Sequence, residues 1–167
     1  MCSSDLLQVQ ELPGFIRQEL TAWGLAPGTL ELEVTENDMM ADPERARRVL
    51  AELRELGVRI AIDDYGTGYS SLSYLRGLPV DVLKIDKSFV MDLAANPDNQ
   101  AIVRSTVELG HDLGLEVVAE GVEDADSLEL LRRWGCDRAQ GFFLGRPLAA
   151  EPFRALLASD APASPCG

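Results

Sequence analysis

The stretch VRIAIDDYGTGYS, at positions 58–70, contains the pattern from which the fold can be inferred. The run Val58 to Ile62 predicts a strand, and Asp63, Asp64 and a turn with two glycines follow it directly. A helical pattern precedes the strand and closes at Gly57. A helix, a strand and a polar turn are therefore predicted in direct succession.

The same succession recurs along the chain. Strands are predicted at Leu30–Val34, Val58–Ile62, Val82–Ile85, Leu115–Ala119 and Arg138–Gln140. Helices are predicted at 12–23, 43–56, 70–75, 99–113 and 124–134, and a last one begins at Pro152. This alternation predicts an α/β fold with a parallel sheet covered by helices, and a repeat of about 30 residues matches one unit of a (β/α)8 TIM barrel. A doubly wound open sheet also fits, although no glycine-rich dinucleotide fingerprint follows any strand.

Length and charge limit the remaining possibilities. The chain has 167 residues, whereas a closed barrel takes about 250, so we expect an incomplete barrel with about five of the eight βα units. This partial domain is predicted at residues 1–157, with a disordered tail at 158–167. A net charge of −13 argues against a nucleic-acid polymer as partner. The sequence has no membrane segment and no signal pattern, which predicts a cytoplasmic location.

Cysteine and histidine provide no site of their own. Cys2, Cys136 and Cys166 are widely separated and lack CxxC spacing, so they are interpreted as reduced thiols. The single histidine, His111, is interpreted as a helix-face residue, because no second His or Cys stands at ligand spacing.

Polar side chains stand near the carboxyl end of every predicted strand, where parallel α/β folds bind their ligands. They are Glu33 and Glu36, Asp63 and Asp64, Lys84 and Asp86, Glu120, and Gln140. Carboxylates that converge on one rim repel each other unless cations neutralise them, and oxygen-rich sets suit Mg²⁺ or Mn²⁺. With a lysine beside them, the set points to two-metal hydrolysis of a phosphodiester. Ordinary solvated strand ends are the alternative.

Five segments carry a family resemblance. They are EVTE at 33–36, DDYGTGYSS at 63–71, KIDKSF at 84–89, AEGVE at 119–123 and QGFFLGRPL at 140–148. In order and spacing they resemble the signature segments of the EAL family of cyclic-di-GMP phosphodiesterases. The resemblance implies hydrolysis of cyclic-di-GMP to linear pGpG on an eight-stranded barrel with two Mg²⁺ or Mn²⁺ ions. An unrelated Mg²⁺-dependent barrel enzyme would need all five segments to coincide by accident.

The resemblance also implies a role for each matching residue. Glu33 and Asp63 resemble metal ligands, with Asp63 placed to bridge both ions, and Asp64 resembles a ligand of the second metal. Lys84 resembles the lysine near the attacking water and the phosphate. Glu120 resembles a metal-side carboxylate, and Gln140 resembles an amide that contacts water or metal.

Glu36 resembles the acid that braces the loop after Asp64. In the family this loop, which here is Tyr65, Gly66, Thr67, Gly68, Tyr69 and Ser70, shapes the metal site and contributes to dimerisation. The two glycines can take backbone angles that a turn next to bound ions demands, or they can simply form a tight strand-to-helix turn.

The sequence departs from the family pattern at its start. The Glu-Ala-Leu segment, whose glutamate is a metal ligand, does not occur here, and the asparagine ligand of the next strand falls at Met1. We therefore expect an open partial barrel that is poorly stable or self-associating, and that is inactive by itself. We also expect the chain to be a fragment of a longer signalling protein, with upstream domains or a homodimer partner. A non-catalytic module that binds cyclic-di-GMP or regulates other proteins is the alternative. The retention of every matching site residue favours descent from an active enzyme.

Overall fold

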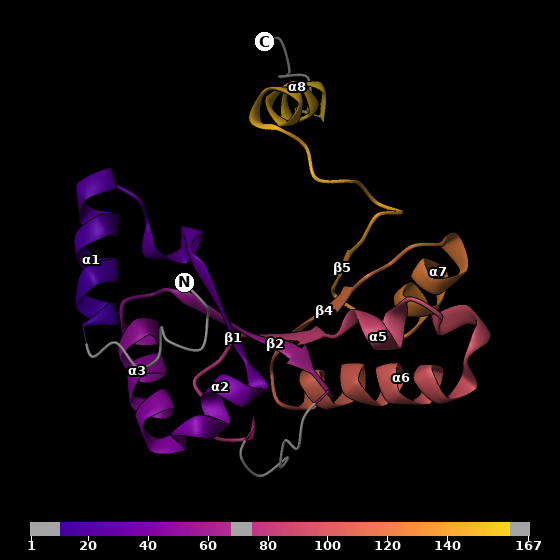
Figure 1. Ribbon diagram of the computed structural model, residues 1–167, viewed down its shortest axis with the longest axis horizontal. Helices are drawn as coiled ribbons and strands as arrows, with labels where there is room; N and C mark the ends of the chain where they lie inside the picture. Colours follow the sequence, from indigo (N-terminus) through magenta and orange to yellow (C-terminus); the bar gives the residue numbers. More distant parts are fainter. Residues whose placement is uncertain (1–10, 68–74, 161–167) are drawn as a thin grey trace, which may run out of the picture.

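A five-stranded parallel sheet forms the centre of the protein (Figure 1). The computed structural model describes residues 11–67 and 75–160, with side chains up to residue 157. The strands are β1 (Glu31–Thr35), β2 (Arg59–Tyr65), β3 (Val82–Ile85), β4 (Glu116–Glu120) and β5 (Arg138–Gln140). They lie in the order β1-β2-β3-β4-β5, and every neighbouring pair is parallel. This sequential order fits the wall of a barrel, because a doubly wound sheet reverses its strand order at a switch point.

The strands agree closely with the predicted ones, and one difference matters for the site. β2 continues through Asp63 and Asp64 to Tyr65, although the sequence pattern assigned these residues to the turn. Strand pairing extends that far because Thr35 pairs with Asp63, and Tyr65 pairs with Ile85 after a register shift. The Asp63 side chain is therefore fixed by the sheet and not by a loop.

The main helices lie close to their predicted positions, and three of them begin at a side-chain cap. They are α1 (Leu12–Trp23), α3 (Pro43–Glu55), α6 (Pro97–Asp112), α7 (Ala125–Arg133) and α8 (Ala150–Asp160). The Asn96 side chain accepts from the backbone N–H groups of Asp98 and Asn99, so α6 begins two residues before its predicted start. Helix α8 ends at Asp160, inside the segment predicted to be disordered, and the predicted helix at 70–75 lies almost entirely outside the described residues.

Four short helices in the described part of the chain were not predicted. They are the α-helices α2 (Glu36–Ala41) and α5 (Lys87–Val90) and the 3₁₀ turns η2 (Pro27–Thr29) and η3 (Leu93–Ala95). Thr35 caps α2 by accepting from Asp38 N at 3.2 Å, and Asp86 caps α5 by accepting from Ser88 N at 2.9 Å. Both caps stand just after or at the end of a strand, where the pattern was interpreted only in terms of ligand binding.

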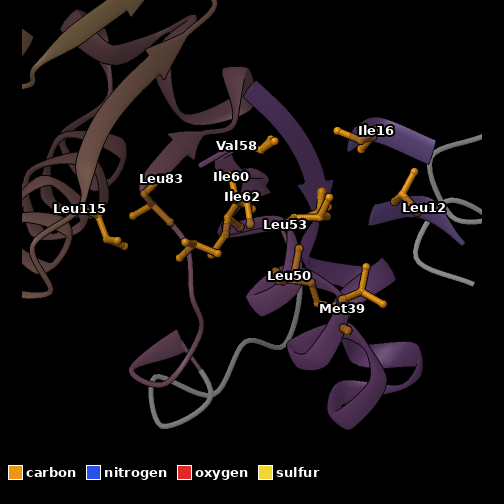
Figure 2. Packing of buried hydrophobic residues seen from close by; sticks show 14 of the residues in the cluster. Leu12, Ile16, Met39, Leu50, Leu53, Val58, Ile60, Ile62, Leu83 and Leu115 are labelled. Atoms are coloured by element: carbon orange, nitrogen blue, oxygen red, sulfur yellow. The ribbon is translucent and has the colours of Figure 1, made fainter. Parts of the chain in front are cut away.

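Apolar side chains of the helices cover the outer face of the sheet. Leu50 and Leu53 of α3 pack with Ile60 and Ile62 of β2, and each of these four side chains is at most 1% exposed (Figure 2). A second cluster joins α6 to β3 and β4. At Gly110 of α6, an added Cβ would lie 2.3 Å from a Val117 methyl carbon, so only glycine permits this close packing.

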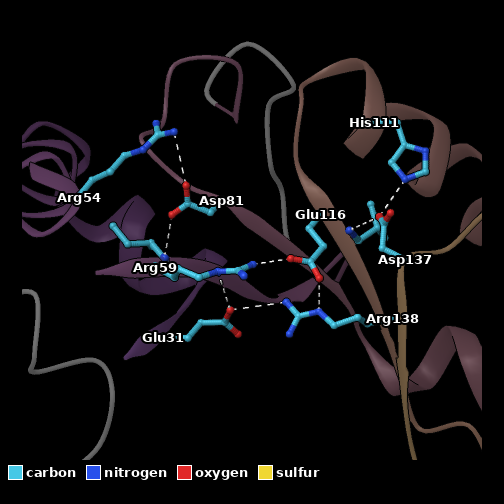
Figure 3. Close-up of polar contacts among 10 residues, drawn as sticks. Glu31, Arg54, Arg59, Asp81, His111, Glu116, Asp137 and Arg138 are labelled. Carbon is cyan, nitrogen blue, oxygen red and sulfur yellow. Dashed lines mark hydrogen bonds and ion pairs between the residues drawn. The ribbon is translucent and has the colours of Figure 1, made fainter. Parts of the chain in front are cut away.

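Charged side chains on the other face show that the sheet is curved. Arg138 of β5 lies 3.5 Å from Glu31 of β1, and these are the two edge strands (Figure 3). In a flat sheet, strands four positions apart would be separated by roughly 19 Å. The contact therefore requires a concave inner face, as in part of a barrel wall.

Helix α8 stands away from the other helices at the end of a long connecting segment (Figure 1). Its Phe153 and Leu157 side chains are 49% and 56% exposed. None of the helices in the described part of the chain is long and apolar enough to cross a membrane.

Candidate functional site

Lys84 lies at the centre of a group of carboxylates. Its Nζ donates to Glu33 Oε1 at 2.6 Å and lies 2.8 Å from Glu120 Oε1 and 2.9 Å from Asp63 Oδ1. The Lys84 side chain is 7% exposed, whereas that of Glu33 is 50% exposed. We call Glu33, Asp63, Lys84 and Glu120 the lysine–carboxylate cluster. The structure brings these four sequence-predicted site residues together.

Strand periodicity explains why the four side chains converge. β1, β2, β3 and β4 contribute one residue each, and successive side chains of a strand point to opposite faces. Ile62 precedes Asp63, Ala119 precedes Glu120, and each is at most 1% exposed. Because the apolar neighbours are buried against the helices, the cluster residues face the concave side, near the carboxyl ends of the strands.

The charges of the cluster keep Lys84 protonated. Burial by itself would lower the pKa of the Lys84 ammonium, but its interactions with Glu120, Glu33 and Asp63 outweigh burial, and the pKa is raised. The lysine is therefore a permanent cation at physiological pH. It neutralises part of the negative charge that three neighbouring carboxylates bring to this rim.

Asp64 is separate from the cluster and pairs with another carboxyl group. Its φ of 54° is the one positive value among the described non-glycine residues, and this turns its side chain away from the regular strand direction. Burial, followed by the charges of Asp63 and Asp86, raises the pKa of Asp64. The Asp86 carboxylate accepts a hydrogen bond from the Asp64 carboxyl, and despite burial the pKa of Asp86 is lowered by Ser88 and Asp64. This pairing was missed because the motif pattern assigns Asp86 no role beyond its place at a strand end.

Glu36 lies outside the cluster, at the first position of α2. It is 3% exposed, and both carboxylate oxygens are buried without a hydrogen-bond partner in the described part of the chain. Its charge acts on Tyr65, whose pKa is raised by burial and then by Glu36. Gly66 follows with a φ of 100° and lies so close to Phe89 that an added Cβ would be 3.0 Å from the ring. Gly68, Tyr69 and Ser70 lie outside the described residues.

Gln140 ends β5 beside Glu120, with which it is paired in register. A pocket next to the cluster is lined by Glu120, Gln140, Phe142 and Met91, among others. The chain turns sharply here, because Gln140 O accepts from Val122 N at 3.1 Å and an added Cβ on Gly141 would lie 2.1 Å from Val122 O. The guanidinium of Arg146 lies 4.7 Å from the centroid of the Phe142 ring. The AEGVE and QGFFLGRPL segments thus form one wall beside the cluster.

The oxygen atoms of the cluster have the chemistry of a divalent-cation site. Three carboxylate oxygens approach one point, the Lys84 Nζ, to within 2.6 to 2.9 Å. Asp63 Oδ1 is buried and has a charge contact but no hydrogen bond of good geometry, so it retains a lone pair that a cation would accept. Within the described ranges, however, no three or more His, Cys, Asp or Glu side chains are already spaced to hold a metal. Oxygen donors of this kind suit hard divalent cations, and an ammonium stands among them.

Comparison with known proteins supports the family resemblance found in the sequence. The EAL domain family model matches residues 2–147. The bifunctional diguanylate cyclase/cyclic di-GMP phosphodiesterase MucR of Pseudomonas aeruginosa is 48% identical over 143 residues, which are 86% of this chain and 21% of that protein. The curated relatives that match are much longer, and the chain spans 18% to 23% of their length.

Two solved structures extend the comparison to the fold. The phosphodiesterase PaMucR, in complex with c-di-GMP, has a TM-score of 0.87 at 45% identity, covering 91% of this chain and 62% of that one. BlrP1 of Klebsiella pneumoniae, in complex with manganese and cyclic-di-GMP, has a TM-score of 0.79 at 39% identity, covering 84% of this chain and 36% of that one. Sequence, strand order and site agree, and this chain belongs to the EAL domain family.

Proposed function

We propose that the lysine–carboxylate cluster is the catalytic rim of a phosphodiesterase site that hydrolyses cyclic-di-GMP to linear pGpG. The observation that carries the proposal is the position of Lys84 within 2.6 to 2.9 Å of carboxylates from three other strands. The family membership supports it, since MucR, a relative, is named a cyclic di-GMP phosphodiesterase. PaMucR and BlrP1 were both solved with the cyclic dinucleotide, which supports the same substrate.

Each residue of the site has a defined part in this proposal. Glu33, Asp63 and Glu120 would hold divalent cations, two in the complete site, with Asp64 as a further ligand. When bound, these ions would lower the pKa of the attacking water and stabilise the leaving oxygen. The Lys84 ammonium binds a phosphate oxygen, and the Gln140 amide orients the water. Glu36, buried beside Tyr65, holds the start of the loop that follows Asp64.

The proposal assigns full activity to a barrel that contains further family segments. The Glu-Ala-Leu glutamate and the asparagine ligand do not occur within these 167 residues, so the metal sites are incomplete. In the described residues, no strand pairs with the outer edge of β1 or of β5. We propose that this chain alone does not turn over substrate, and that it acts in the cytoplasm within a longer protein, as a monomer or a homodimer.

The direct test follows pGpG formation from cyclic-di-GMP and Mn²⁺ by chromatography. The purified chain should form no more product than its Asp63→Asn variant. A chimera in which the upstream EAL residues of MucR precede this chain should be active, and Asp63→Asn in the chimera should abolish turnover. Undiminished hydrolysis by the substituted chimera would refute the role of Asp63.

A non-catalytic binding module is the second candidate, because the Lys84 ammonium already stands where a cation would bind. A folded chimera that binds cyclic-di-GMP in calorimetry but forms no pGpG would favour this candidate. Turnover by the unextended chain, well above the Asp63→Asn control, would show that the remaining ligands suffice for catalysis.

A further inference from the structure

The Lys84 ammonium occupies the point at which the cluster's carboxylates would bind a divalent cation. Oxygens from Glu33, Glu120 and Asp63 lie at 2.6, 2.8 and 2.9 Å from Nζ. Ligand oxygens lie about 2.0–2.2 Å from Mg²⁺ or Mn²⁺, so each of these oxygens would have to move inward by about 0.4 to 0.9 Å to join an inner coordination sphere. The lysine thus gathers three carboxylates around one point, although within the described residues these side chains are not yet spaced to hold a metal.

The ammonium and a divalent cation cannot share this point. A metal within the three oxygens would lie less than about 3 Å from the present Nζ position, and the Lys84 side chain is 7% exposed, which limits screening by water. Two cations in such contact repel each other strongly. The ammonium must therefore withdraw from the cluster when a metal enters it.

We propose that Lys84 is an exchangeable internal cation, which holds Glu33, Asp63 and Glu120 together without metal and is displaced from them when a divalent cation binds. This inference rests on the proposed function, because it concerns the metal site of the same cluster. It adds that the lysine competes with the metal for these carboxylates. Metal binding and movement of the Lys84 ammonium out of the cluster, toward the substrate, are then one coupled event.

The chain contains a matched control for this lysine. Lys84 and Lys87 are its two lysines, and they are three residues apart. Lys87 is exposed at the start of α5 and has no ion pair with the described residues. Lys84→Met and Lys87→Met therefore make the same change in charge and composition, one inside the cluster and one outside it.

The test measures Mn²⁺ affinity of the whole chain by isothermal titration calorimetry at neutral pH. Lys84→Met should bind Mn²⁺ at least about tenfold more tightly than the unsubstituted chain, because the competing cation is gone, and Lys87→Met should not differ. Without metal, Lys84→Met should melt at a lower temperature than the unsubstituted chain, and Mn²⁺ should restore most of the loss. Equal, weaker or absent Mn²⁺ binding by Lys84→Met would overturn the proposal.

A second measurement needs no substitution, in case Lys84→Met does not fold. An amine-acylating reagent labels both lysines, and mass spectrometry gives the labelling of Lys84 relative to Lys87. Added Mn²⁺ should raise this ratio roughly threefold or more, because the Lys84 side chain, which is 7% exposed inside the cluster, becomes accessible to the reagent when it leaves the carboxylates. An unchanged or lower ratio contradicts the exchange.

Neither readout involves cyclic-di-GMP, so the two proposals can fail separately. Exchange without hydrolysis would count against the proposed function alone, and hydrolysis without exchange would count against this inference alone.

Discussion

Arg138 of β5 lies 3.5 Å from Glu31 of β1, which joins the two edge strands across the concave face of the sheet. Arg59 of β2 and Glu116 of β4 complete a closed ring, since Arg59 lies 3.3 Å from Glu31 and both arginines contact Glu116 (Figure 3). All four side chains belong to the first residue of their strand. The ring therefore fixes the curvature of the sheet at the end opposite to the lysine–carboxylate cluster.

Replacement of Arg138 by methionine should destabilise the protein, because Glu31 and Glu116 then share a single arginine. The side chains are partly exposed, so we expect the free energy of unfolding to fall by only about 1 kcal/mol. Urea denaturation followed by circular dichroism measures this change. The exposed Arg132→Met on α7 should leave the midpoint unaltered.

A double-mutant cycle separates the ring contact from other effects of the substitution. If Arg138 acts through Glu31, the effects of Arg138→Met and Glu31→Gln should be non-additive in the double variant. Strict additivity would show that the two edge strands are not coupled through this pair.

The sequence predicted the sheet well because strand periodicity and strand-end chemistry are local signals. All five strands were placed within a few residues, and β3 and β5 match their predicted bounds. The convergence of Glu33, Asp63, Lys84 and Glu120 followed from the rule that parallel strands end on one rim. The roles proposed for these residues come from the family resemblance, because residue spacing alone left them open.

Other features depend on geometry that a linear pattern does not contain. The ring of Glu31, Arg59, Glu116 and Arg138 forms only because the sheet curves, and nothing in the spacing of these residues marks them as partners. Helix α2 was missed because its six residues are too short for a periodic signal, although Thr35 caps it. The position of a lysine inside the carboxylate group, where a metal had been expected, depends on how the side chains pack on the concave face.

The N-cap of α7 should make stability depend on pH in the acidic range. Asp124 accepts from Ser127 N at 2.7 Å and from Ser127 Oγ at 2.8 Å, and these hydrogen bonds hold its pKa below the usual value. A lowered folded-state pKa stabilises the protein above the unfolded-state pKa, and this stabilisation is lost as pH falls through the folded-state pKa. Asp124→Ala should therefore cost about 1 kcal/mol at neutral pH, and the difference should shrink below about pH 4.

Thermal denaturation of both proteins between neutral and acidic pH measures this effect. Asp126→Ala, an exposed substitution in the first turn of the same helix, serves as the control and should show a much smaller loss. A destabilisation by Asp124→Ala that is as large at strongly acidic pH as at neutral pH would contradict the capping role of the carboxylate.

The thiol of Cys136 should be chemically inert in the folded protein. Burial raises its pKa to about 11, and its Sγ contacts the backbone oxygens of Val117 and Arg138 at 3.5 and 3.3 Å. The thiolate is the reactive species, so alkylation by iodoacetamide near pH 8 should be many-fold slower in the folded chain than in guanidinium chloride. Mass spectrometry of the peptide that contains Cys136 gives both rates. Equal rates would mean that this thiol is accessible and ionised.

Exposed apolar side chains near the carboxyl end of the chain should drive self-association. Phe142 and Leu148 are 54% and 51% exposed, and Phe153 and Leu157 of α8 are 49% and 56% exposed. A monomeric protein rarely leaves so many large apolar side chains open in one region. Within the described residues no strand pairs with the outer edge of β1 or β5, which adds to the tendency. Sedimentation velocity should show concentration-dependent oligomers.

The double substitution Phe153→Ser and Leu157→Ser should shift the chain toward monomer, whereas Ala155→Ser on the same helix should not. A compact monomer at every concentration, with a cooperative melting transition, would show that this surface is not adhesive.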